Sequence, residues 1–150
     1  MVDKQTLRQM NCLHILRDEQ LDKLASLTEI QSYAKDIYVE QEDEIAQALY
    51  IVLRGRVSIE IKIPLDRRVS VYIVRPGDLF GWSAAVSPHT VTASSLCLEP
   101  CELIVFPREP LLRLLEEDIP LKASLMEMIT HVIRHRLKDT RQQMSYLLGG

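Results

Sequence analysis

The residues best suited to hold a small molecule lie in one stretch, residues 75–86, and in the segment that follows it, residues 88–94. Gly77 and Gly81 are four residues apart and are followed by small residues, so the chain can turn tightly here and begin a short helix. Exposed amide groups at such a helix start favour an anion. Many surface turns share these features, so the elements on either side must decide how the stretch is used.

Composition and charge restrict the class of protein. The chain has 150 residues, of which 47% are hydrophobic and 26% charged, as in a globular domain that buries a core without disulfides. Its net charge of −3 argues against nucleic acid as a partner of the chain as given. Cys12, Cys97 and Cys101 form no CxxC pair, and no stretch resembles a signal peptide or a membrane span. We therefore expect a reduced, cytoplasmic protein with no membrane partner.

The periodicity of the apolar residues predicts a mainly β fold. Two short helices are expected over residues 3–10 and 19–28, and from residue 29 the pattern alternates with a period of two. The predicted strands are residues 50–53, 57–63, 69–73, 90–98 and 102–106. Short strands separated by Gly, Pro and Asp are typical of an antiparallel sandwich or barrel. The expected fold class is α+β, mainly β with flanking helices, in a jelly-roll or double-stranded β-helix.

Two helices are predicted after the strands. The first covers residues 109–116, and Asp118 and Pro120 open a longer one that reaches roughly to Leu148. A helix of about 28 residues is about 40 Å long, more than a domain of this size can cover. It therefore either pairs with its copy in a homodimer, which we favour, or lies only on its own sheet. The predicted dimer interface is Leu125, Ile129, Val132, Ile133, Leu137 and Met144.

This order of elements resembles the cyclic nucleotide-binding domain of the Crp/Fnr regulator superfamily. Residues 49–57 are similar to the family's strand–glycine–strand hairpin, and residues 76–81 to the entry of its phosphate-binding cassette. Ile119 and Pro120, followed by residues 133–137, are similar to its dimerisation helix. The resemblance covers nearly the whole chain. It implies a jelly-roll unit, residues 1–118, and a dimerisation helix, residues 119–150, within one domain.

The resemblance also implies where the ligand binds. The family's cassette carries a glutamate that accepts the ribose 2′-hydroxyl and an arginine that neutralises the cyclic phosphate. Phe80 and Gly81 match the family, but Trp82 stands at the glutamate position and Val91 at the arginine position. Losing a charge-assisted contact of this kind costs on the order of 2–5 kcal/mol, or roughly 30-fold to several thousand-fold in affinity. Tight cAMP binding is therefore not expected.

The cassette still offers groups to a small ligand, which we expect to be anionic. Amides around Ser83 and Ala84 could hold an anion, and Trp82 could stack on a flat ligand or fill the vacated site as core. His89 either supplies a titratable charge or is an exposed turn residue. Thr140 aligns with a threonine that reaches the base across the dimer in cAMP-responsive members, or it is helix surface. The predicted ligand site is Phe80, Gly81, Trp82, Ser83, Ala84, His89, Val91, Thr92, Ala93 and Thr140.

Other chemistry is not indicated. His131 and His135 stand one helical turn apart and could clamp a metal, but no further ligand cluster accompanies them, so we interpret them as part of a solvated basic helix face. The cysteines lack the spacing of an iron–sulfur cluster. No nucleophile elbow, P-loop or paired-carboxylate motif is present, so we expect neither a metal, a cofactor nor an enzymatic activity.

Three hypotheses about function follow. The favoured one is a dimeric sensory domain that binds a small, anionic ligand in a divergent cassette and signals through the dimer helix. The second is a degenerate domain without a ligand that serves as a dimerisation or protein-interaction module. The third is the effector half of a Crp/Fnr-type transcription regulator, because the family's helix-turn-helix domain would follow Leu148.

Overall fold

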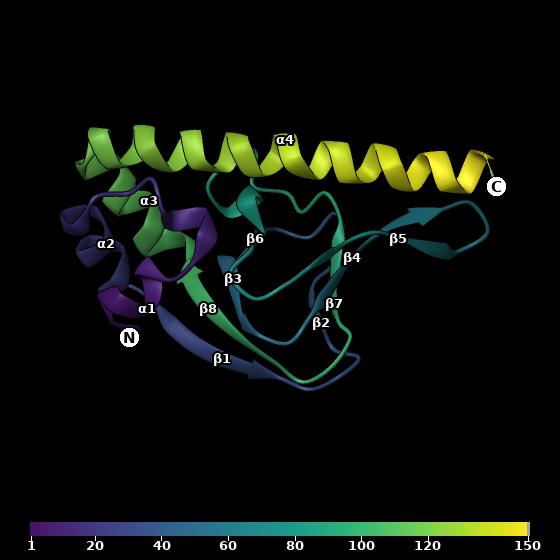
Figure 1. Cartoon of the computed structure of the whole chain (residues 1–150), viewed down its shortest axis with the longest axis horizontal. Helices are drawn as coiled ribbons and strands as arrows, with labels where there is room; N and C mark the ends of the chain where they lie inside the picture. Colours follow the sequence, from purple (N-terminus) through teal and green to yellow (C-terminus); the bar gives the residue numbers. More distant parts are fainter. Residues whose placement is uncertain (150) are drawn as a thin grey trace.

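Two antiparallel sheets face each other at the centre of the fold (Figure 1). The structure is a computed structural model and describes residues 1–149. The strands are β1 (Glu29–Tyr33), β2 (Tyr38–Glu40), β3 (Ala48–Arg54), β4 (Val57–Ile63), β5 (Arg67–Val74), β6 (Leu79–Phe80), β7 (Ser94–Cys97) and β8 (Cys101–Pro107). One sheet has the order β1-β8-β3-β6 and the other β2-β7-β4-β5. The predicted jelly-roll, mainly β with flanking helices, is confirmed.

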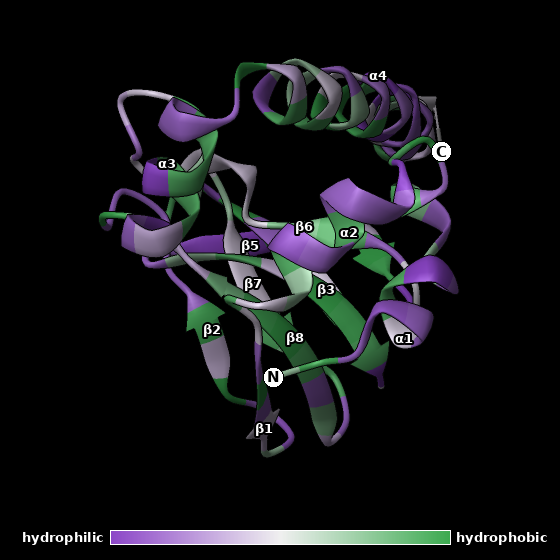
Figure 2. Ribbon diagram, turned by 90° about the vertical axis from the view of Figure 1, so that its left-hand side faces the viewer, coloured by the Kyte–Doolittle hydropathy of each residue, from purple (hydrophilic) through white to green (hydrophobic). Residues whose placement is uncertain are grey.

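Helices cover one sheet and extend beyond it. The helical segments, with η for a 3₁₀ helix, are α1 (Lys4–Arg8), η1 (Asn11–Leu13), α2 (Asp18–Ala25), η2 (Trp82–Ala84), α3 (Arg108–Glu117) and α4 (Ile119–Gly149). Figure 2 shows α4 above the sheets, with α3 on one side and α1 and α2 on the other. Gly150, the last residue of the predicted long helix, lies outside the described residues.

Strand β3 joins two hydrophobic clusters because both of its faces are covered. Leu49 and Ile51 point to the cluster shared with the helices, whereas Tyr50 and Val52 point to the cluster between the two sheets. Alternate residues of a strand face opposite sides, so a strand buried on both faces is a continuous apolar run. This explains why the apolar run of β3 does not alternate with polar residues as β4 does.

The strand predicted over residues 90–98 is shorter than expected. Strand β7 begins at Ser94, and Thr90 makes only an isolated bridge with Ile45. The segment before β7 is held instead by loop contacts, since the Val91 amide donates to the Glu44 carbonyl over 2.8 Å. The residues before β7 are therefore free of ladder pairing and can line a cavity.

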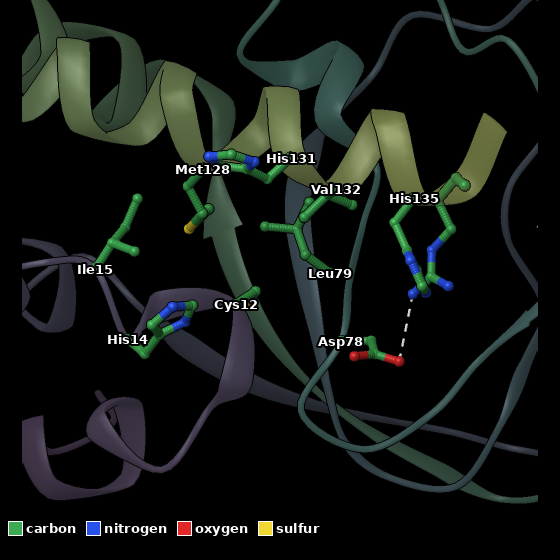
Figure 3. A pocket seen from close by; sticks show the side chains of 10 residues that line it. Cys12, His14, Ile15, Asp78, Leu79, Met128, His131, Val132 and His135 are labelled. Atoms are coloured by element: carbon green, nitrogen blue, oxygen red, sulfur yellow. Dashed lines mark ion pairs between the residues drawn. The ribbon is translucent and has the colours of Figure 1, made fainter. Parts of the chain in front are cut away.

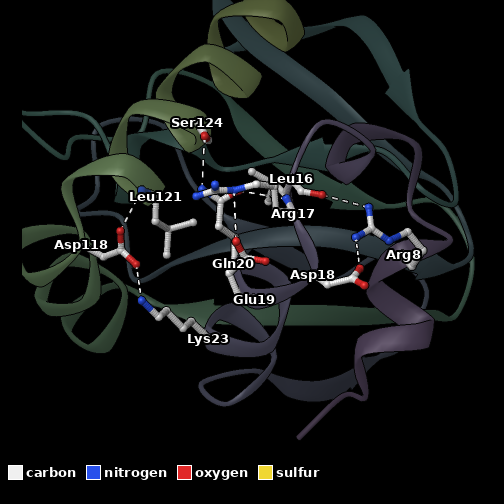
Figure 4. A network of polar contacts seen from close by, with 10 residues as sticks. All are labelled: Arg8, Leu16, Arg17, Asp18, Glu19, Gln20, Lys23, Asp118, Leu121 and Ser124. Atoms are coloured by element: carbon white, nitrogen blue, oxygen red, sulfur yellow. Dashed lines mark hydrogen bonds and ion pairs between the residues drawn. The ribbon is translucent and has the colours of Figure 1, made fainter.

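Polar contacts fasten the N-terminal helices to the start of α4 (Figure 4). Lys23 on α2 pairs with Asp118, and the Asp118 carboxylate accepts a 3.0 Å hydrogen bond from the Leu121 amide. Gln20 donates to the Ser124 hydroxyl over 3.4 Å. Asp118 thus caps α4 as predicted, and the hydrogen bond from Lys23 lowers the pKa of its carboxyl. The first turns of α4 are consequently fixed relative to α2.

Helix α4 changes character along its length. It contains 31 residues, about 46 Å at 1.5 Å per residue. After Ile129, the only buried residue of α4 within residues 1–149 is Arg136. Apolar side chains beyond that point are exposed, with Leu137 60% and Met144 54% accessible. None of the helices in the described part of the chain is long and apolar enough to cross a membrane.

Two residues of the predicted dimer interface face inward instead. Leu125 and Ile129 are only 1% and 2% exposed and pack in the core of their own chain. Val132 is half-buried and also packs against that core. Helical spacing placed all these residues on one apolar stripe, but the stripe is wide enough to serve two surfaces. The exposed part of it contains Ile133, Leu137 and Met144.

The β3–β4 hairpin provides a test of the fold. Gly55 has a φ of +93°, and a Cβ there would lie 2.6 Å from the Cys101 Sγ and 2.7 Å from the Pro100 carbonyl oxygen. We expect Gly55→Ala to lower the free energy of unfolding by about 2–5 kcal/mol in urea denaturation, since backbone strain and overpacking add. Gly77→Ala is the control, because Gly77 has a φ of +90° but its nearest neighbour lies 3.6 Å away; it should lose about 1–2 kcal/mol. Equal losses would contradict the proposed clash.

Candidate functional site

The cassette, defined as residues 80–93, begins where β6 ends against β3. Phe80 is 1% exposed, and its ring stacks on Tyr50 with 5.0 Å between centroids. Gly81 follows with a φ of +78°, and a Cβ there would stand 2.9 Å from the Tyr50 ring. Only glycine lets the backbone approach Tyr50 so closely while it turns into η2. The Phe-Gly pair is therefore required by packing, whatever the ligand.

The cassette encloses a small cavity. Its volume is about 20 Å³, enough for about one water molecule. The predicted site residues that line it are Phe80, Gly81, Trp82, Ser83, Val91, Thr92 and Ala93. Trp82 is half-buried and packs against the hydrophobic core, so its indole takes part of the space at the position of the family's glutamate. In this arrangement any ligand larger than about one water molecule requires Trp82 to move.

Three predicted site residues lie away from the cavity. Ala84, the last residue of η2, is fully buried, and Thr140 donates its hydroxyl to the Arg136 carbonyl of its own helix over 2.8 Å. The His89 Nδ1 lies 2.8 Å from the Ser83 carbonyl oxygen, and the His89 ring lines a different hollow, formed with α3 and α4. As the N–H donor in that contact, His89 organises the loop. It does not stand in for the missing arginine.

The turn of the cassette provides little of an anion site. Helix η2 has only three residues, and one of its amides, that of Ala84, already donates to the Gly81 carbonyl. Val91, at the family's arginine position, is 4% exposed and part of the core. The cation that would hold a phosphate is thus replaced by a buried apolar side chain.

A buried carboxyl that was not predicted faces the cavity instead. Glu40, at the end of β2, is 7% exposed and lines the cavity. Its Oε2 atom has no hydrogen-bond partner within residues 1–149, and its Oε1 atom lies 3.1 Å from the position of a Cβ on Gly81. Most buried polar atoms have a partner. A hydrogen-bond donor placed beside this unpaired carboxylate oxygen would therefore be stabilising.

The environment of Glu40 alters its acidity. Burial, reinforced by the negative charge of Glu44, raises the pKa of Glu40 from its ordinary 4.5 to about 7. Near neutral pH this group can therefore accept a hydrogen bond as the carboxylate or donate one as the acid. The inward position of Glu40 could not be predicted from the sequence. Strand β2 is only three residues long, and its register with β7 shifts between Tyr38 and Glu40, so the alternation that would assign each residue to a face of the sheet is broken.

Arg136 connects the cassette to α4. It is 9% exposed and pairs with Asp78 at 3.3 Å and with Asp139 at 2.9 Å. Its guanidinium lies 5.0 Å from the centre of the Tyr72 ring, and Tyr72 also lines the cassette cavity. Asp78 belongs to the turn directly before β6. The helix therefore contacts the cavity through Tyr72 and contacts the cassette entry through Asp78.

The histidines and cysteines form no cluster of another kind. Within residues 1–149, no three His, Cys, Asp or Glu side chains are grouped so as to hold a metal ion. His131 lies 3.9 Å from Glu127, and His135 lies 3.9 Å from Asp139, both on exposed helix surface. Burial raises the pKa of Cys12 and of Cys97 to about 12, as expected of inert structural thiols.

A jelly-roll with a glycine-led cassette beneath a long C-terminal helix defines a class of regulatory ligand-binding domains. The family model for the cyclic nucleotide-binding domain matches residues 30–118, and the chain belongs to this family. It is 25% identical over 134 residues to the cyclic AMP receptor protein of Thermus thermophilus, covering 89% of this chain. The chain spans 60% of the length of that relative.

Solved structures share the whole fold. A protein of Geobacter metallireducens, provisionally assigned as a cyclic nucleotide-binding protein, has a TM-score of 0.81 and 26% identity, covering 91% of this chain and 99% of its own. The sensor domain of the transcriptional regulator DNR from Pseudomonas aeruginosa has a TM-score of 0.70 and 21% identity, covering 90% of this chain and 91% of its own. These likenesses agree with the resemblance inferred from the sequence to Crp/Fnr regulators.

The acidity of Glu40 predicts a dependence of stability on pH. Because its folded pKa lies above its unfolded value, the folded state binds more protons between those two values, and stability falls as pH rises through that window. At 1.36 kcal/mol per pKa unit, the difference between 4.5 and about 7 amounts to about 3 kcal/mol by pH 8.

Glu40→Gln should remove this slope. In urea denaturation we expect the variant to be about 1–3 kcal/mol more stable than the natural chain at pH 8, with the gap closing near pH 5. The same substitution at exposed Glu29 controls for the loss of one carboxylate. Identical pH profiles for Glu40→Gln and the natural chain would contradict the assignment of a buried, orphaned carboxyl.

Proposed function

We propose that this chain is a small-molecule-sensing domain whose cassette has exchanged phosphate recognition for recognition by a buried carboxyl. The orphaned Glu40 carboxylate carries this proposal, because it lines the cavity in a member of the cyclic nucleotide-binding family. Regulation rather than catalysis is the role that the family supports. The ligand acts by changing the position of the cassette relative to α4.

The proposed ligand presents hydrogen-bond donors and no phosphate. An anion beside Glu40 would be repelled when the carboxyl is ionised, and Val91 offers no compensating cation. A primary amine or an amide could donate to the orphan Oε2 atom, and the Ser83 and Thr92 hydroxyls at the cavity could accept or donate further. We therefore propose a ligand that carries hydrogen-bond donors, in place of the anionic ligand expected from the sequence. Trp82 has to move aside to admit it.

Signalling would use the contacts that Arg136 makes. A ligand that displaces Trp82 presses on the cavity wall that includes Tyr72, and Tyr72 lies under the Arg136 guanidinium. The family's mode of action, a shift between two arrangements of the long helix, is compatible with this path. Only a ligand that binds one arrangement better than the other can shift their populations.

The long helix offers a surface for a second copy. Ile133, Leu137, Met144 and Leu147 recur at intervals of four, seven and three residues, and they are 38%, 60%, 54% and 61% exposed. These intervals fit the two apolar positions of a heptad repeat, which form the seam of paired helices. We propose that two chains pair along this seam, without the buried Leu125 and Ile129.

Specific observations favour the two other hypotheses. The cavity of about 20 Å³ around Trp82 is what a degenerate domain without a ligand would contain. The match to only 60% of a cyclic AMP receptor protein is what the effector half of a transcription regulator would give. Glu40 weighs against the degenerate domain, because a site without a ligand gains nothing from a buried carboxyl that destabilises the fold.

The cassette can be tested with its own fluorophore. Trp82 is the single tryptophan of the chain, and it lines the cavity, so we expect its emission to change with primary amines or amides and not with micromolar cAMP or cGMP. In Glu40→Gln the affinity for amines should fall by about tenfold or more, because a charge-assisted hydrogen bond is lost. Micromolar cAMP binding would refute the proposed ligand class, and silence toward every compound would favour the degenerate domain.

The proposed seam predicts the effect of a charge within it. Leu137→Glu should convert a dimer into a monomer in light scattering, because a carboxylate cannot be buried between the two helices without a partner. Leu65→Glu, at an 86% exposed position in the β4–β5 turn, is the matched control and should leave the mass unchanged. A monomeric natural chain at micromolar concentration would rule out the seam.

A further inference from the structure

A second, larger cavity lies on the other flank of α4, between this helix and the N-terminal segment around η1. Its volume is about 330 Å³, within the range of small-molecule sites. In Figure 3, Met128 and Val132 project from α4 toward Leu79, with His14 and Ile15 on the opposite side of the space. It shares no lining residue with the cassette cavity.

The floor of this cavity is apolar. Leu79 is 1% exposed and Met128 is 2% exposed, and the half-buried Val132 and Cys12 complete the surface. Burial raises the pKa of the Cys12 thiol to about 12, so this residue adds no charge. An occupant must therefore present hydrocarbon or aromatic surface to the floor.

Histidines stand at the rim of the cavity, and basic side chains lie beside it. His131 and His135 line it and also line a neighbouring hollow on α4 together with Arg134, Lys138 and Arg141. Asp78, which lines the cavity, pairs with Arg136 at 3.3 Å, and Asp139 pairs with Arg136 at 2.9 Å. Glu127 lies 3.9 Å from His131. The apolar cavity thus opens onto a surface where cationic side chains exceed carboxylates.

The cavity does not coincide with the proposed dimer seam. At 100° per residue, Met128, His131 and His135 lie on the opposite side of the buried stripe from Ile133 and Leu137. Pairing along the seam would leave the cavity open. An occupant can therefore bind in either oligomeric state.

From this arrangement we propose that the cavity is a second ligand site, which takes an amphipathic anion with an apolar chain or ring and one acidic group. The apolar part fills the space between Leu79, Met128 and Val132. The acidic group lies at the rim near His131 and His135. This site is independent of the ligand proposed for the cassette.

A ligand in this second cavity would also affect the cassette. Leu79 is the first residue of β6 and directly precedes Phe80 and Gly81. A molecule wedged between Leu79 and α4 fixes the distance between the helix and the strand that begins the cassette. The second site is thus placed to regulate the first.

Calorimetric titration of the full chain with octanoate and with octyltrimethylammonium tests the proposal. The two probes share an eight-carbon chain and differ in the sign of the head group. We expect octanoate to bind in the millimolar range or tighter, and at least fivefold more tightly than octyltrimethylammonium. Apolar burial can be nearly athermal near 25 °C, so the titration is run at two well-separated temperatures. No heat with octanoate at either temperature, or a preference for the cation, would overturn the proposal.

Variants locate the binding. Val132→Phe fills the cavity and should weaken octanoate at least tenfold, whereas Val86→Phe, the same type of change at a 38% exposed position on the cassette flank, should not. Replacing Arg134 and Lys138 together with Gln should weaken octanoate about twofold to tenfold. Glu29→Gln, which removes one exposed carboxylate on β1, should leave octanoate binding unchanged and controls for the change in net charge.

A measurement on the natural chain covers the case in which Val132→Phe does not fold. Met128 lines the cavity, while Met144 is 54% exposed farther along α4. Octanoate should shift the ¹³C-methyl resonance of Met128 and leave that of Met144 in place. Shifts at Met144 without a shift at Met128 would show that octanoate binds the exposed helix, and the proposal would fall.

Discussion

The ion pairs of the buried Arg136 are the contacts on which the arrangement of α4 depends. The exposed half of this helix has no other buried residue within the described chain, and Arg136 pairs there with the half-buried Asp78 and Asp139 while covering Tyr72. Solvent reaches the two carboxylates and screens the pairs, but Arg136 itself would be left buried without a partner if both were removed. Because helical geometry fixes every other side chain once one is anchored, Arg136 also orients the dimer seam on one flank and the second cavity on the other.

Two features of the cassette act in the same direction. Val91, which stands at the arginine position of the resemblance, is buried core, and the Glu40 carboxyl faces the cavity. Two like charges ~5 Å apart repel by about 3 kcal/mol at an effective dielectric constant of about 20. In the proposed site that repulsion would add to the attraction lost with the arginine, so a phosphate would be disfavoured more strongly than by the loss of the arginine alone. Because burial raises the pKa of Glu40 to about 7, the proposed discrimination would depend on pH near neutrality.

The features predictable from the sequence are those that depend on neighbours along the chain. The turn at Gly55, the helix start at Asp118 and the position of the cassette at Phe80 and Gly81 all follow from short patterns. Glu40 was missed because its role depends on Gly81 and Val91, which lie far away in the sequence. The stripe on α4 was read as one interface, although it divides between the core, with Leu125 and Ile129, and the surface. Spacing identifies apolar faces but does not state what covers them.

Both cavities border the same structural unit, β6 with the turns beside it. The cassette cavity lies after Phe80 and the apolar cavity before it, at Leu79, and α4 contacts both sides through Arg136 and Met128. A ligand on either side must therefore adapt to one shared position of β6 against the helix. If the two ligands prefer different positions, each lowers the affinity for the other, and by thermodynamic linkage the effect is equal in both directions. The fold thus supplies the coupling between two sites without a contact between the two ligands.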